Sequence, residues 1–253
     1  MALKKGYDFI IFCYNDEAGE GEDFVNAVRT GGASPFYACY LFDFDYTLAD
    51  SSKGIVGCFH RTMEAFGFPV VDDLTITRTI GLPMRDAVRR ITGLSDAGEI
   101  EAFLTHYRAL ADKYMTANTF FYPEALDVLR ALKQRGADVA IISSKTSHRI
   151  REAFVRDKAE DLVDFIIGCE EVRELKPSPE GIRLALARFG LAEKDALYTG
   201  DSTTDAAAAE NAGVAFLGVT HGVTGAEELA AYPHAAISDT LETALTLRRG
   251  DGK

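Results

Sequence analysis

The sequence predicts an α/β protein, a doubly wound parallel sheet with an inserted α-helical domain. A continuous apolar run, Ala38 to Phe42, ends at an acidic residue, as a buried strand leading into a polar loop would. Between positions 51 and 118 apolar residues recur three and four apart without a clear strand. After position 119, short apolar runs alternate with helical segments, which is typical of a parallel sheet covered on both faces.

The predicted elements follow this pattern in order. Strands are expected at 38–42, 139–142, 165–167, 196–198, 214–217 and 235–237, and helices at 124–134, 147–156, 179–189, 204–211, near 226 and at 241–247. The core is assigned to residues 36–50 and 119–253, and the helical cap to 51–118. Residues 1–35 form an extension, interpreted as an edge strand (7–14) and a short helix (22–30) before a glycine-rich linker, or as an arm.

Composition excludes several classes of function. The chain of 253 residues is 47% hydrophobic and 26% charged, which suits a globular domain, and no apolar run reaches the roughly 18–20 residues of a membrane span. A net charge of −12 without a dense basic block argues against nucleic-acid and membrane partners. The four cysteines form no CxxC pair, so neither a zinc site nor a disulfide framework is expected. A cytoplasmic monomer or homodimer is predicted.

Polar residues follow four of the predicted strands. They are Asp43 and Asp45 after the first strand, Ser143 and Ser144 after the second, Lys176 a short loop after the third, and Asp201 and Asp205 after the fourth. Each alone would be an ordinary helix cap or turn. Because ligands bind beyond the carboxyl ends of parallel strands, their order at successive strand ends favours one shared site.

These residues resemble the motifs of the haloacid dehalogenase superfamily, specifically its phosphatase branch with an α-helical cap and a Rossmann-like core. The resemblance covers about residues 36–250 and is strongest for the phosphoglycolate phosphatase group. Asp43-x-Asp45-x-Thr47 is similar to the first motif and Ser143 to the second. Lys176 is similar to the third, and Gly200-Asp201 with Asp205 to the fourth. Tyr46 departs from the pattern, since close relatives usually carry glycine there, and its ring is expected to narrow or shield the site.

The resemblance implies a role for each residue. Asp43 would attack phosphorus and Asp45 would transfer the leaving-group proton, while Lys176 offsets the negative charge. Mg²⁺ would be held by Asp43, the backbone carbonyl of Asp45, Asp201 and Asp205. Thr47 would orient Asp45, and Ser143, Ser144 and Arg85 would contact the substrate, Arg85 from the cap loop at 81–85. Asp50 is interpreted as a helix cap.

The implied function is Mg²⁺-dependent hydrolysis of a small phosphomonoester, phosphoglycolate-like or a sugar phosphate, through an aspartyl-phosphate intermediate. The same residues also suit a phosphomutase or a pyrophosphatase. A non-catalytic binding protein on this fold is the remaining alternative, and the presence of Asp43, Asp45, Lys176 and Asp201 argues against it.

Overall fold

The computed structural model describes residues 34–251, and the chain divides into two units, residues 1–34 and 35–253. The strand and helix predicted within residues 1–35 lie outside the described residues. Everything below concerns the second unit.

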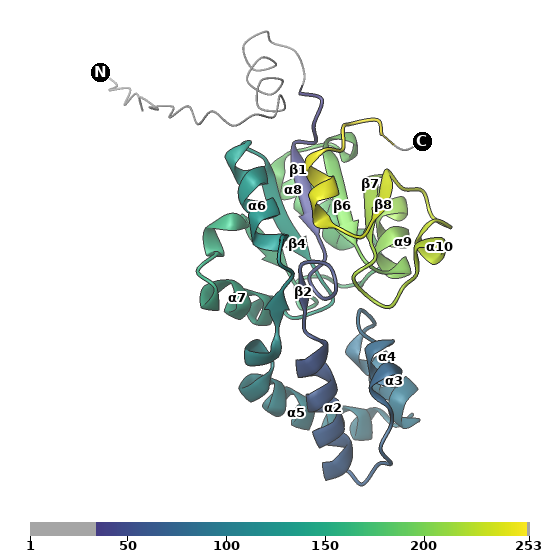
Figure 1. The fold of residues 1–253 in the computed structure, drawn as a ribbon. Helices are drawn as coiled ribbons and strands as arrows, with labels where there is room; N and C mark the ends of the chain where they lie inside the picture. The colour runs from purple at the N-terminus through teal and green to yellow at the C-terminus, as the bar shows by residue number, and fades with distance from the viewer. Residues whose placement is uncertain (1–33, 252–253) are drawn as a thin grey trace, which may run out of the picture. The chain divides into compact units, whose positions relative to one another are not determined.

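A six-stranded parallel sheet forms the centre of this unit, in the order β5-β4-β1-β6-β7-β8 (Figure 1). The strands are β1 (Cys39–Phe42), β4 (Asp138–Ile142), β5 (Phe165–Ile167), β6 (Ala196–Gly200), β7 (Ala215–Val219) and β8 (Ala236–Ser238). The chain returns to the middle of the sheet after β5, so the strand order reverses between β1 and β6. The predicted doubly wound α/β fold is confirmed.

Side chains alternate between the two faces of the sheet and pack against a layer of helices on each face. From β1, Tyr40 and Phe42 join the core under one layer, whereas Cys39 and Leu41 join the core under the other. The first layer contains α6 (Ala125–Gln134), α7 (Ser147–Arg156) and the 3₁₀ helix η4 (Leu241–Leu245), and the second contains α8 (Glu180–Phe189), α9 (Thr203–Ala212) and α10 (Ala226–Leu229). Short 3₁₀ turns, η2 (Glu160–Leu162) and η3 (Glu193–Asp195), precede β5 and β6.

A helical insertion, residues 51–118, leaves the sheet after β1 through a two-stranded antiparallel ribbon, β2 (Ala49–Asp50) with β3 (Phe120–Phe121). It contains α2 (Ser52–Ala65), α3 (Asp73–Thr77), α4 (Met84–Thr92), α5 (Ala97–Tyr114) and η1 (Thr116–Asn118). These helices enclose an apolar core of their own around Phe59, Phe103 and Leu104. The side chain of Asp96 caps α5 by accepting from the Gly98 and Glu99 amides at 2.9 Å.

The last predicted helix, 241–247, is shorter and tighter than expected, because the chain forms the 3₁₀ helix η4 and stops at Leu245. A 3₁₀ helix rarely exceeds one turn, and apolar spacing alone does not separate it from the start of an α-helix. Within residues 34–251, none of the helices has both the length and the apolar character needed to cross a bilayer.

Candidate active site

The predicted site residues gather at the carboxyl ends of the central strands. Asp43 directly follows β1 and Asp201 directly follows β6, and these two strands are hydrogen-bonded neighbours with Phe42 paired to Thr199. Ser143 directly follows β4 on the other side of β1. The edge at which the strand order reverses therefore brings acidic and hydroxyl side chains together, as expected for an open parallel sheet.

Three buried carboxylates form the centre of the site. One oxygen from each of Asp43, Asp201 and Asp205 lies within 4.8 Å of the others, and all three side chains are buried. The Lys176 ammonium lies 3.0 Å from Asp43 Oδ1 and 2.5 Å from Asp205 Oδ1. Three carboxylates and one ammonium leave a net charge of about −2 when all are ionised, which a divalent cation would neutralise. Carboxylate oxygens are also the ligands that Mg²⁺ and Ca²⁺ prefer, so the residues present fit such an ion.

Burial and mutual repulsion shift the titration of these groups. Burial raises the pKa of Asp43 to about 6, with Lys176 opposing and Asp205 and Asp45 adding to the shift. Burial first, then Asp205 and Asp43, hold the pKa of Asp201 well above its usual range. At Lys176, burial opposes the charge, but Asp205 and Asp43 outweigh it and keep its pKa above the ordinary value. Asp43 and Asp201 are thus carboxylates that lack sufficient positive charge around them, whereas Lys176 stays charged.

Asp205 is held by more contacts than the other two carboxylates. It occupies the third position of α9 in a reciprocal capping box with Ser202, whose backbone amide donates to Asp205 Oδ2 at 3.1 Å. The buried Tyr198 hydroxyl donates to its Oδ1 at 2.9 Å, beside the contact from Lys176. These partners fix Asp205 and, through it, the ammonium of Lys176.

The contacts of Asp45 differ from the prediction. Thr47 was expected to orient Asp45, but its hydroxyl donates to Asp201 Oδ1 at 3.3 Å. Asp45 instead accepts from the hydroxyl of Ser51 and lies 2.8 Å from the Lys145 ammonium. The cause is the turn between them: Tyr46 adopts a left-handed backbone with φ 59°, which rotates Thr47 away from Asp45.

Two further predictions concern residues beside this loop. The Tyr46 side chain is buried. A Cβ atom added to Gly222 would lie 3.1 Å from the Cβ of Tyr46, so Tyr46 packs closely against the loop that contains Gly222. Asp50 accepts from the Ser52 amide at 2.8 Å, a first-turn donor of α2, which agrees with its interpretation as a helix cap.

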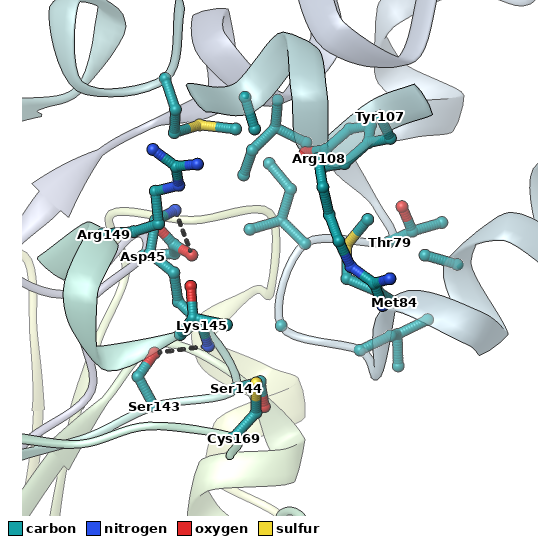
Figure 2. Close-up of a pocket in the computed structure, with 18 of the residues that line it drawn as sticks. Asp45, Thr79, Met84, Tyr107, Arg108, Ser143, Ser144, Lys145, Arg149 and Cys169 are labelled. Carbon is teal, nitrogen blue, oxygen red and sulfur yellow. Dashed lines mark hydrogen bonds and ion pairs between the residues drawn. The ribbon is translucent and has the colours of Figure 1, made fainter. Parts of the chain in front are cut away.

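A cavity of about 410 Å³ extends from this centre into the helical insertion. Its sheet side contains Asp43, Asp45, Ser143, Ser144 and Lys145. The hydroxyl oxygen of Ser144 is buried without a hydrogen-bond partner among the described residues, so it is available to a ligand. Figure 2 shows Asp45, Ser143 and Lys145 on one side of the cavity and Thr79, Met84, Tyr107 and Arg108 of the insertion on the other.

The chain matches the model of the haloacid dehalogenase-like hydrolase family over residues 40–219, which is more than half of its length. It belongs to this family. The matched range contains all of the proposed centre, from Asp43 through Asp205.

Individual relatives agree with this membership. The chain is 30% identical over 203 residues to probable phosphatase IndB of Dickeya dadantii, covering 79% of this chain and 88% of that protein. It is 28% identical to phosphoglycolate phosphatase 1 of Pseudomonas aeruginosa, covering 84% and 82%. A solved haloacid dehalogenase-like hydrolase from Bacteroides fragilis is 45% identical with a TM-score of 0.79, covering 82% of this chain and 99% of that one. The prediction of a phosphatase of this family is confirmed.

Arg85, predicted to contact the substrate, does not line the cavity of this hydrolase. Its guanidinium pairs with Glu101 of α5 at 2.5 Å, and its side chain is half exposed. Because α4 begins at Met84, Arg85 falls on the helix face that meets α5 instead of the face that lines the cavity. The arginine that the insertion contributes to the cavity is Arg108, which pairs with the same Glu101 at 2.7 Å.

Sequence reasoning assigned no role to Lys145 or Arg149, the two cations on the sheet side of the cavity. Lys145 directly follows the serine pair, and Arg149 lies about one helical turn further on α7. Their positions beside the second motif could have suggested that they lie at the site. Their ion-pair partners could not have been predicted, since Lys145 pairs with a carboxylate 100 residues away in the chain.

Proposed function

We propose that this phosphatase hydrolyses a small phosphomonoester with Mg²⁺, through an aspartyl-phosphate formed on Asp43. The observation that carries the proposal is the cluster of Asp43, Asp201 and Asp205 with one buried ammonium, next to a cavity of about 410 Å³ that Asp43 lines. Such a cluster needs a divalent cation to be neutral, and the cavity leads to the one carboxylate best placed to attack, Asp43.

Asp43 and Asp201, with the backbone carbonyl of Asp45, would hold the ion, and Asp205 would complete the acidic cluster. When bound, Mg²⁺ supplies positive charge that lets a carboxylate approach a phosphate dianion. Lys176, 3.0 Å from Asp43, contributes fixed positive charge. The hydroxyls of Ser143 and Ser144 would contact the phosphoryl oxygens from the cavity wall.

In the first step a carboxylate oxygen of Asp43 attacks phosphorus while the bond from phosphorus to the leaving oxygen breaks. Asp45 gives a proton to that oxygen, and the alcohol leaves. In the second step Asp45 takes a proton from water as the water oxygen attacks the aspartyl-phosphate, which returns Asp43 to a carboxylate. Phosphoryl oxygens compete with Asp45 for the Lys145 ammonium, so substrate binding would release Asp45 from its ion pair.

The helical insertion would act as a cap that excludes water and contacts the leaving group. Phosphoglycolate and sugar phosphates are the first compounds to test, since several relatives are named phosphoglycolate phosphatases. The cytoplasmic location, the monomeric or homodimeric state and the absence of nucleic-acid and membrane partners remain predictions from composition.

The test compares wild type with Asp43→Asn on a panel of phosphomonoesters with Mg²⁺. We expect phosphate release by wild type, a loss of about 10³-fold or more in the variant, and no activity in excess chelator. Acid-quenched wild type should carry a phosphoryl group on the peptide containing Asp43. The control is Asp161→Asn, an exposed aspartate on η2. Turnover that survives Asp43→Asn in a folded protein contradicts the proposal.

A further inference from the structure

We infer that the preferred substrate is the phosphomonoester of an alcohol with a largely apolar carbon skeleton, alkyl or aromatic, and not of a hydroxy acid or a sugar. This rests on the proposed function and specifies the leaving group, about which the phosphoryl-binding residues carry no information. Three features of the cavity support it: the chemistry of its wall, the state of its cations and its size.

The wall that the insertion contributes is mostly apolar, although Thr79, Tyr107, Arg108 and Asp112 also line it. Six of its side chains are Ile55, Phe59, Leu82, Met84, Leu104 and Met115. They come from three of the insertion's helices and the segments next to them. The sheet end is polar throughout, with Asp45, Ser143 and Lys145, which lie on the opposite side in Figure 2. A ligand with its phosphoryl group at the sheet end would therefore place its leaving group against hydrocarbon. A sugar, with a hydroxyl on nearly every carbon, would lose hydration there without replacement hydrogen bonds.

Each ammonium and guanidinium group that lines the cavity within residues 34–251 already has a carboxylate partner. Lys145 pairs with Asp45 at 2.8 Å, and Arg108 pairs with Glu101 at 2.7 Å. Arg149, which is buried, pairs with Asp112 and lies 3.1 Å from Glu152. The remaining basic side chain of the cavity, His148, is exposed.

A leaving group that carries a carboxylate, as in phosphoglycolate, would have to displace one of these carboxylate partners. The side chains of Lys145 and Arg149 are largely buried and already paired, so a substrate carboxylate gains at each only the difference between itself and the partner that it displaces, and the exposed Arg108–Glu101 pair is weak. Pyrophosphate faces the same obstacle, because its leaving group is a second phosphate. The wall therefore discriminates against a second anion while it accepts an apolar group.

The size of the cavity points the same way. Ligand sites of roughly 300–1,000 Å³ enclose drug-sized molecules, and this one has about 410 Å³. A two-carbon acid would fill only the phosphoryl end and leave the apolar wall unused. An alkyl chain of several carbons or an aromatic ring would bury that wall, and each buried methylene would add binding energy.

The test is a series of primary n-alkyl phosphates, ethyl, butyl and hexyl, assayed with Mg²⁺ beside phosphoglycolate, pyrophosphate and glucose 6-phosphate. The alkyl leaving groups are of closely similar basicity, so differences in rate report contact with the wall. We expect kcat/KM to rise about fourfold for each added methylene, and hexyl phosphate to exceed phosphoglycolate. A flat or falling series, or a preference for phosphoglycolate or the sugar phosphate, overturns the inference.

Matched variants locate the effect. Leu82→Ser should reduce the ratio of hexyl to ethyl phosphate turnover at least about fivefold. Leu74→Ser makes the same change at an exposed position on α3 outside this cavity and should leave the ratio unchanged. Should Leu82→Ser fail to fold, Met84→Gln, a near-isosteric change at the start of α4, replaces it and should reduce the same ratio. A ratio unaltered in the folded cavity variant overturns the inference.

The two proposals fail in different ways. If no phosphomonoester is turned over, or if turnover does not need Asp43, the proposed function is wrong. If turnover needs Asp43 but favours phosphoglycolate, pyrophosphate or the sugar phosphate, the proposed chemistry stands and the assignment of the leaving group is wrong.

Discussion

At the scale of single residues, the acidic centre fits a cation but is unfavourable for stability without one. Asp201 is buried beside Asp43 and Asp205, and the hydrogen bond that it receives within the described residues comes from Thr47 at 3.3 Å. Lys176 lies against Asp43 and Asp205 instead. In the metal-free protein, ionisation of Asp201 is therefore unfavourable. Function and stability make opposite demands on this carboxylate.

We predict that Asp201→Asn stabilises the metal-free protein. A carboxyl whose pKa is raised on folding binds its proton more tightly in the native state, so its contribution to stability is lost as pH rises through the folded pKa. The pKa of Asp43 is also raised on folding, from its ordinary 3.8 to about 6, so its contribution to stability is likewise lost as pH rises through that range. At pH 8 we expect a gain of about 1 kcal/mol or more, or about 2–4 °C in Tm.

The measurement is thermal unfolding between pH 4 and 8, with and without Mg²⁺. The Tm difference between Asp201→Asn and wild type should grow with pH, and Mg²⁺ should stabilise wild type more than the variant. Asp161→Asn, at an exposed position, should show neither effect. A variant that is less stable than wild type at pH 8 without metal would show that Asp201 is favourably paired in the native state.

At the scale of elements, the loop after β7 closes the acidic centre. Gly222 lies so near Asp201 that a methyl group on it would overlap the carboxylate and approach the Cβ of Tyr46 at 3.1 Å. We predict that Gly222→Ala lowers Mg²⁺ affinity about 10- to 100-fold, because the carboxylate must move from its position. Titration calorimetry with Mg²⁺ measures this directly.

Gly225→Ala is the matched control in the same loop. A Cβ atom there would meet nothing nearer than 3.7 Å, at Glu228 Oε1, which is an ordinary contact. Its Mg²⁺ affinity should equal that of wild type. Equal affinities for Gly222→Ala and wild type would mean either that the loop moves aside freely or that Asp201 is not a ligand.

Elements also show how far the sequence predicts this site. Apolar runs located β1, β4 and β6, and strand order then required Asp43, Ser143 and Asp201 to meet, because the carboxyl ends of parallel strands share one edge. Side-chain direction inside a loop was not predictable. Thr47 donates to Asp201 because Tyr46 adopts a left-handed backbone conformation. That conformation favours glycine, and a tyrosine in the sequence rarely predicts it.

The insertion was less predictable than the sheet for the same reason. Helical spacing predicts that α4 and α5 exist, but which arginine faces the cavity depends on the residue at which α4 begins. A start at Met84 directs Arg85 to Glu101 and leaves Arg108 of α5 at the cavity. A shift of one residue rotates a helix face by about 100°, so the assignment of Arg85 depended on a boundary that spacing does not fix.

At the scale of the whole described unit, α7 joins the insertion to the sheet. Arg149 of α7 pairs with Asp112 of α5, and the Thr116 hydroxyl donates to Glu152 at 2.5 Å. Arg156, at the end of α7, donates to the Thr116 carbonyl oxygen at 2.5 Å. These contacts surround the point at which the insertion returns to the core, so they set how firmly the insertion is held over the cavity.

The last prediction is that Asp112→Asn loosens this connection. Arg149 is buried and keeps Glu152 as a partner, and Asp112 is largely exposed, so the loss of stability should be about 1 kcal/mol. Local opening should increase more than global unfolding, which amide hydrogen exchange along η1 and the end of α5 would show. The control, Asp86→Asn, breaks an exposed pair with Arg89 inside α4 and should change stability by less than about 0.5 kcal/mol. Equal exchange rates in the two variants would mean that the Arg149–Asp112 pair does not restrain the insertion, and the apolar contacts of its helices would then be the restraint that substrate binding has to work against.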